Sequence, residues 1–250
     1  MVVLFGLVVL FREPIRIRYW GYQLAHSTSA TDRDYYFQLL ASRNERSLPI
    51  ARRLLASGDV QTRLDAVDLA TTVKSRAATA LLARACDDPD AAVRRRAIIA
   101  LARRDDDGIV GRLRTLADHT DVDTAMLATS ALTTVGSPRA LETLIQLAHA
   151  NHRAGVRAQA IESLSQWGPE PGVRTALEAC LNDDVLVEFP IETERQARAA
   201  LAFAQGKLAE RGEPITLDDT DPFTPMTNAQ RAARALDRLN VSIPTSAPAP

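Results

Sequence analysis

The sequence predicts an all-α protein built from about five stacked helical hairpins, in the manner of an α-solenoid. The first observation is composition: the 250 residues are 46% hydrophobic but only 5% aromatic, and Ala, Leu and Arg dominate. Such residues favour closely packed helices over a β-sandwich or barrel. The second is an internal repeat of about 31 residues, which is typical of helical-hairpin arrays.

An uninterrupted apolar run, residues 1–11, opens the chain and is followed by Arg12, Arg16 and Arg18. Eleven residues span about 16 Å as a helix, roughly half of a bilayer's hydrocarbon core. Because the positive charge follows the run, a secretory signal is disfavoured. We therefore expect residues 1–22 to anchor the chain on the cytoplasmic side of a bacterial inner membrane, with Tyr22 among the headgroup-level aromatics.

The expected membrane-anchor residues are Val2, Val3, Leu4, Phe5, Leu7, Val8, Val9, Leu10, Phe11, Tyr19 and Trp20. Two alternatives stay open. The run is a buried strand or helix that covers the end of the array, and the chain is then cytoplasmic. Alternatively, the run is part of a longer spanning helix.

The helical pattern begins at Thr31 and forms pairs separated by turn signals. The expected pairs are 31–41 with 46–57, 60–73 with 75–86, 90–104 with 109–118, 121–135 with 138–150, and 153–167 with 171–181. Matching positions recur through these pairs, since small or apolar residues must pack each hairpin on its neighbours. They include Ala66, Ala97, Ala128 and Ala160 in the first helices, and Leu82, Leu113, Leu144 and Leu177 in the second.

Polar residues recur with the same period. Asp59, Asp90 and Asp121 precede first helices, where a carboxylate accepts hydrogen bonds from unpaired backbone N–H groups. At one shared position further along, Arg63, Arg94 and Arg157 are expected to reach the neighbouring pair. Cys86 and Cys180 lie near the ends of second helices, which predicts inert, buried thiols in a reducing compartment.

The segments DPDAAVRRRAIIAL and VGSPRALETLIQL, with their period, resemble HEAT-like repeats of the short type named after phycobilisome lyases. The resemblance covers residues 30–183 well and 191–211 loosely. It implies a right-handed α-solenoid over residues 30–211. Repeats of this type are widespread in scaffolds and regulatory subunits, so the resemblance specifies the fold more closely than the function.

After Leu181 the period breaks, and residues 191–211 are expected to form one Ala-rich helix that closes the array. Residues 212–250 form an acidic, proline-punctuated tail. Within it a short helix is expected over 228–240, with one apolar side made of Ala229, Ala232, Ala233, Leu236 and Leu239. The tail folds back on the array, stays disordered or docks into a partner.

Arginines are concentrated between Arg94 and Arg114, but Asp105, Asp106 and Asp107 interrupt them and aromatic residues for base stacking are scarce. Nucleic-acid binding is therefore disfavoured. His149 and His152 share a helical face without further ligands at metal-site spacing. The sequence contains no GxSxG, GxxxxGK[ST], HExxH or CxxC motif, and we expect no catalytic residue, metal or cofactor.

These observations favour a non-catalytic scaffold. Its partner is expected to bind at exposed positions of the second helices. The predicted partner-binding residues are Arg84, Arg112, Arg114 and Gln146. The expected partner is another protein or a membrane protein complex. Two further hypotheses are a structural or assembly subunit of a membrane complex, and, by resemblance, a bilin-lyase-like or chaperone accessory protein for a pigment protein.

Overall fold

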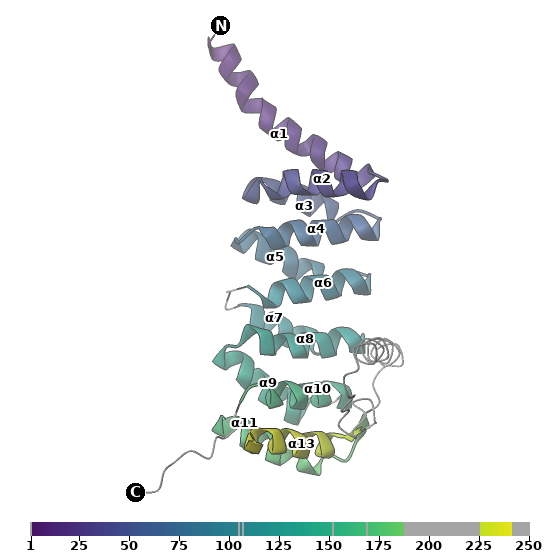
Figure 1. Cartoon of the computed structure of the whole chain (residues 1–250), viewed down its shortest axis with the longest axis vertical. Helices are drawn as coiled ribbons and strands as arrows, with labels where there is room; N and C mark the ends of the chain where they lie inside the picture. Colours follow the sequence, from purple (N-terminus) through teal and green to yellow (C-terminus); the bar gives the residue numbers. More distant parts are fainter. Residues whose placement is uncertain are drawn as a thin grey trace, which may run out of the picture. The chain divides into compact units, whose positions relative to one another are not determined.

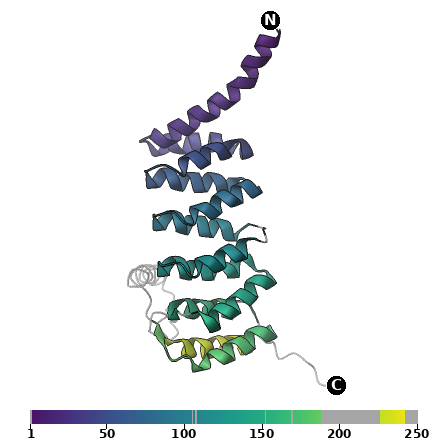
Figure 2. The same cartoon turned by 180° about the vertical axis from the view of Figure 1, so that it is seen from behind.

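The computed structural model describes residues 2–104, 106, 108–151, 153–168, 170–187 and 226–241. Within these residues the chain is all-α apart from one pair of two-residue strands. It divides into two compact units, residues 1–115 and 116–250. Each unit is a stack of helical hairpins (Figure 1 and Figure 2). The predicted fold class is confirmed.

The first unit begins with a long helix and continues as helical hairpins. Its elements are α1 (Val2–His26), α2 (Ala30–Ala41), the 3-10 helix η1 (Asn44–Ser47), α3 (Leu48–Leu54), α4 (Val60–Thr72), α5 (Arg76–Ala85), α6 (Ala91–Ala102) and α7 (Gly108–Leu116). The first helices α2, α4 and α6 pack in succession, and α3 and α5 pack against α4 and α6. These elements follow the predicted pairs closely.

The predicted aspartate caps are confirmed in both units. The carboxylate of Asp59 accepts the backbone N–H of Thr62 at 2.7 Å, and that of Asp90 accepts the N–H of Ala92 at 2.8 Å. Asp121 caps α8 (Val122–Val135) in the same way. Each cap satisfies a backbone donor that has no partner within its own helix, so each first helix begins at a defined residue.

Arg63 makes the cross-connection that the sequence predicted. Its guanidinium pairs with the carboxylate of Asp88 beyond α5, with Nε to Oδ2 at 2.8 Å. It also donates to the carbonyl oxygens of Ser57 and Gly58, at the end of the preceding hairpin. One buried side chain thus holds two successive hairpins together.

The chain from Val2 to His26 forms the single continuous helix α1. Beyond Pro14, α1 packs against α2 and α3 and buries Ile17, Trp20 and Leu24. Trp20 is only 6% exposed, and the guanidinium carbons of Arg16 and Arg43 lie 5.1 and 5.3 Å from its ring centre. Trp20 was expected at headgroup level; here it is a packing residue, because the hairpin α2–α3 covers its ring.

Gly21 allows α1 to approach α3 closely. A Cβ atom at this position would lie 2.5 Å from Cγ2 of Ile50 on α3. That separation is far inside van der Waals contact, so a larger residue would force the Ile50 side chain or one of the two helices to shift.

Among the described helices, none is both long and apolar enough to cross a lipid bilayer.

The second unit contains two hairpins, a strand pair and a closing helix. Its elements after α8 are α9 (Pro138–Ala150), α10 (Ala154–Ser165), α11 (Pro171–Ala179), the 3-10 helix η2 (Cys180–Asn182), β1 (Leu186–Val187), β2 (Met226–Thr227) and α13 (Asn228–Val241). β1 and β2 are antiparallel, with Leu186 opposite Thr227. Gly136 ends α8 in the left-handed region at φ 64°, as a residue without a Cβ does readily.

α13 packs against α10 and α11 at the end of the second unit. Its start is a capping box: Gln230 N–H donates to Thr227 Oγ1, and Thr227 N–H donates to Gln230 Oε1. α13 forms where a helix over 228–240 was expected, and it lies against the last hairpin; residues 212–225 and 242–250 of the expected tail are outside the described residues. The predicted apolar side is corrected in part, since Ala232 is buried but Ala233 is exposed. The helix predicted over 191–211 lies outside the described residues.

Candidate protein-interaction face

The second helices of the first unit share one chemical property. α3, α5 and α7 carry arginines and contain no aspartate or glutamate. We call the following residues the arginine face: Arg52, Arg53, Arg76, Arg84, Arg112 and Arg114. In the second unit, α9 and α11 each combine arginine with glutamate. Among the described second helices, the purely basic composition therefore belongs to the first unit.

The repeat register aligns part of the arginine face. A shift of 31 residues superimposes the buried positions of one second helix on those of the next. These positions are Ser47, Ile50, Ala51 and Leu54 in the first hairpin, and Ala78, Leu81, Leu82 and Ala85 in the second. The same shift carries Arg53 onto Arg84. Both side chains are exposed, so they occupy matching sites on consecutive hairpins.

Four members of the arginine face have free guanidinium groups. Arg52, Arg53, Arg76 and Arg84 are exposed, and none makes a hydrogen bond or ion pair with any residue that the structure describes. Sequence reasoning found only Arg84 among these four. The signal that would have found the others is the absence of carboxylates from Leu48–Leu54 and Arg76–Ala85.

Helix electrostatics explain some of these arginines. Arg52, Arg53, Arg84 and Arg114 lie in the last turns of their helices, where positive charge stabilises the helix dipole by about 0.3–1 kcal/mol. Arg76 is the first residue of α5, where the same dipole disfavours a cation. Helix stability therefore does not account for Arg76, whose side chain is exposed.

Arg112 and Arg114 are half-buried and engaged within the protein. The Arg112 guanidinium donates to the carbonyl oxygen of Ala83 at 3.2 Å and pairs with the carboxylate of Asp87. Arg114 also has an interaction partner. Arg112 therefore ties α7 to the end of α5, and any partner would have to compete with Asp87 for its charge.

Gln146 is exposed on α9 in the second unit. It is thus a surface residue, as the sequence predicted, but it belongs to a different unit from the arginine face. The candidate site is accordingly defined by residues of the first unit alone.

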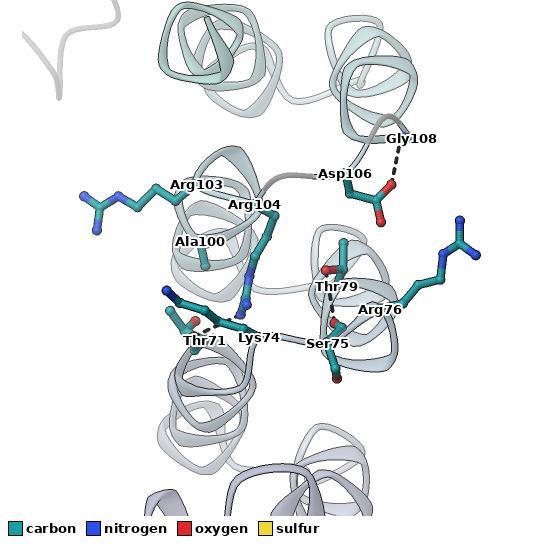
Figure 3. Close-up of a pocket in the computed structure, with 10 residues that line it drawn as sticks. All are labelled: Thr71, Lys74, Ser75, Arg76, Thr79, Ala100, Arg103, Arg104, Asp106 and Gly108. Atoms are coloured by element: carbon teal, nitrogen blue, oxygen red, sulfur yellow. Dashed lines mark hydrogen bonds between the residues drawn. The ribbon is translucent and has the colours of Figure 1, made fainter. Parts of the chain in front are cut away.

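A hollow of about 900 Å³ lies beside the arginine face, between the turns that follow α4 and α6. Figure 3 shows Arg76 and Arg103 pointing to opposite sides of this hollow. Arg104 instead lies along the end of α4, where it donates to the carbonyl oxygens of Val73 at 2.7 Å and Ala70 at 2.8 Å. Arg76 and Arg103 therefore do not converge on one small anion in this hollow.

Neither cysteine has the character of a nucleophile. Burial raises the pKa of the Cys86 thiol to about 12 and that of Cys180 to about 11. Within the described ranges, no three His, Cys, Asp or Glu side chains gather as metal ligands. His149 is exposed, and His152 lies outside those ranges.

Residues 110–188 match the family model described as HEAT repeats. No curated protein matches the sequence. Among solved structures, an engineered protein is 18% identical over 90% of this chain and 97% of its own length, with a TM-score of 0.40. A designed armadillo repeat protein in complex with the peptide (KR)4 is 16% identical over 88% and 98%, with a TM-score of 0.40.

Human deoxyhypusine hydroxylase in complex with glycerol is also similar, at 16% identity over 94% of this chain and 99% of its own, with a TM-score of 0.29. Scores of this size add nothing to the assignment of a site. The family match over residues 110–188 and the helical hairpins of both units together support a HEAT-like repeat protein.

Proposed function

We propose that this protein is a non-catalytic interaction scaffold whose arginine face binds an acidic segment of another protein. The observation that carries the proposal is the set of exposed, unpaired arginines on helices without a carboxylate. Stacked helical repeats commonly offer an extended surface of this kind to partners. A partner with aspartates or glutamates would match its charge.

The spacing of the repeats restricts the partner further. Neighbouring packed helices lie about 8–10 Å apart. An extended peptide advances about 3.3 Å per residue, so side chains three residues apart are separated by about 10 Å. Arg53 and Arg84 occupy equivalent sites on consecutive second helices. Carboxylates at every third residue of an extended segment would therefore meet successive arginines.

Affinity isolation with the full chain tests this proposal. The informative variant is Arg53→Glu/Arg84→Glu, because both side chains are exposed and unpaired. Reversal at Arg112 is a poorer test, since it also breaks the contact with Ala83 and Asp87. We expect the wild type to capture a stoichiometric partner and the variant to lose it. A stoichiometric partner that the variant retains would contradict the proposal, as would failure of the wild type to capture any protein.

A second proposal concerns location. The apolar residues 2–11 and the arginines that follow them belong to one continuous helix, which favours a tether on the cytoplasmic side of a bacterial inner membrane. The scaffold would then act as an adaptor, or as an assembly subunit, of a membrane complex. Recovery of the full chain in the soluble fraction without detergent would contradict the tether.

An accessory role for a pigment protein, by analogy with the phycobilisome-lyase type of repeat, is the remaining alternative. It predicts that a tetrapyrrole or its apoprotein is isolated with the chain. Isolation of an unrelated acidic partner would exclude this role and favour the scaffold.

A further inference from the structure

All four tyrosines of the chain gather on the first two helices. Tyr19 and Tyr22 lie on α1, and Tyr35 and Tyr36 on α2. The rings of Tyr19 and Tyr36 meet edge to face, with centres 6.4 Å apart, and those of Tyr35 and Tyr36 lie 5.3 Å apart. The rings of Tyr19, Tyr35 and Tyr36 therefore form a cluster that joins the two helices, whereas the ring of Tyr22 stacks on that of His26, with centres 4.1 Å apart.

This cluster is exposed. Tyr19, Tyr22 and Tyr35 are 52%, 59% and 59% exposed, and Ile15 on α1 is 65% exposed. We call these residues, together with Tyr36, the tyrosine face. Ile15, Tyr19 and Tyr22 follow one another at helical spacing, so they share one side of α1. Scattered exposed apolar residues are ordinary, but several on one side of a helix, next to a ring cluster, make a candidate contact surface.

The tyrosine face is distinct from the side of α1 that the protein covers. Ile17, Trp20 and Leu24 are buried against α2 and α3. α1 thus has two apolar sides, of which the first unit covers one. On the second side, the ring contact between Tyr19 and Tyr36 joins α1 to α2, and more than half of the surface of Tyr19 and of Tyr22 stays exposed.

The charges beside the tyrosine face identify the surface it fits. Arg16 and Arg18 are exposed on α1, whereas the carboxylate of Glu13 is already paired with Arg43 and Arg46. Among the described side chains of α1, the charge without a carboxylate partner is therefore positive, with Arg16 also lying over the Trp20 ring. Asp32 and Asp34 are exposed at the start of α2, next to Tyr35 and Tyr36, so the basic edge of the tyrosine face is α1 and its acidic edge is the start of α2.

Tyrosine is typical of the boundary between lipid headgroups and hydrocarbon, and arginine of the headgroup layer. The same helix begins with the apolar residues 2–11. We infer that the tyrosine face seats the first unit on an anionic lipid surface, with α1 lying along the headgroups. This inference rests on the tether proposed above and adds the residues that fix the orientation of the unit at the membrane.

Co-sedimentation of the full chain with lipid vesicles tests whether the tyrosine face contacts an anionic lipid surface. The vesicles are phosphatidylcholine with or without phosphatidylserine, and the variants are Tyr22→Ser/Tyr35→Ser and Arg18→Gln. The control is Leu181→Ser, an exposed apolar residue of the second unit at 42% exposure. We expect tighter binding to the anionic vesicles, a loss of about fivefold for Arg18→Gln, and a larger loss for the tyrosine variant. The control should bind as the wild type does.

Hydroxyl-radical footprinting distinguishes lipid contact by the tyrosine face, the seat, from membrane attachment through residues 2–11, the tether. We expect anionic vesicles to protect Tyr22 and Tyr35 from oxidation and to leave Leu181 unchanged. Vesicle binding without protection at the tyrosines overturns the seat and leaves the tether intact. Absence of any vesicle binding overturns both. Protection that appears without lipid as protein concentration rises also overturns the seat, because a second copy of the chain would then cover this face.

Discussion

Arg157 of α10 and Asp183 form the connection on which α13 is docked. Arg157 Nε lies 2.6 Å from Asp183 Oδ2, and Arg157 also donates to the carbonyl oxygen of Asn151 at 2.9 Å. The side-chain amide of Asn228, the first residue of α13, donates to the same carboxylate at 2.7 Å. Asp183 therefore links the end of the last hairpin to the helix that closes the second unit.

Asp183→Asn should loosen α13. The substitution removes the charge that holds Arg157 and weakens the bond to Asn228, at an expected cost of about 2 kcal/mol. Amide hydrogen exchange should show faster exchange in α13 than in the wild type, with α8 little affected. The control is Asp184→Asn at an exposed neighbouring position. Equal exchange in Asp183→Asn and wild type would contradict the docking role.

The stability of the second unit should depend on pH through the same carboxylate. The hydrogen bond from Arg157 lowers the pKa of Asp183 below its ordinary value of 3.8, and Asn228 contributes. Because the folded pKa lies below the unfolded one, this stabilisation is complete above about pH 4 and is lost as pH falls through the folded pKa. Urea unfolding at successive pH values should show a smaller acid-induced loss in Asp183→Asn than in wild type.

Gly21→Ala should destabilise the first unit by about 1–3 kcal/mol, because its new methyl group overlaps Ile50. Gly111→Ala is the matched control: a Cβ there meets nothing within 4 Å, and alanine is the better helix former. Combining Gly21→Ala with Ile50→Ala should cost less than the sum of the single changes. Additive costs in denaturant unfolding would show that the two residues are not in contact.

Arg104→Ala should cost about 1–2 kcal/mol, because its guanidinium satisfies carbonyl oxygens at the end of α4. Arg103 is the neighbouring control, since it is exposed and unpaired within the described residues. Arg103→Ala should change the free energy of unfolding by less than about 0.5 kcal/mol. If both variants unfold alike, the contacts of Arg104 contribute no stability.

Local patterns explain what the sequence could predict. The caps at Asp59 and Asp90 connect residues within one helical turn, so adjacent residues in the sequence are enough to predict them. By contrast, Trp20 is buried by residues of other helices, and Arg112 on α7 contacts Ala83 on α5. Nothing in the local pattern of residues specifies such contacts. The prediction was therefore sound for hairpins and weaker for the exposure of individual site residues.

For the arginine face, too, the sequence predicted the helix that carries each residue but not the contacts of its side chain. The sequence pointed to Arg84 on α5 and to Arg112 and Arg114 on α7 because both helices were recognisable as second helices. It could not distinguish Arg84, which is unpaired, from Arg112, which pairs with Asp87. That distinction depends on how consecutive hairpins stack, and it decides which residue is available to a partner.

The most direct test of the central claim is a fluorescence anisotropy titration of the full chain with an extended peptide carrying glutamate at every third residue. Binding should weaken with salt and fall at least tenfold in Arg53→Glu/Arg84→Glu. The control Arg95→Glu/Arg103→Glu changes net charge equally but alters exposed residues outside the arginine face, and it should bind nearly as the wild type does. Equal losses in the two variants would contradict the claim, because net charge and not the arginine face would then govern binding.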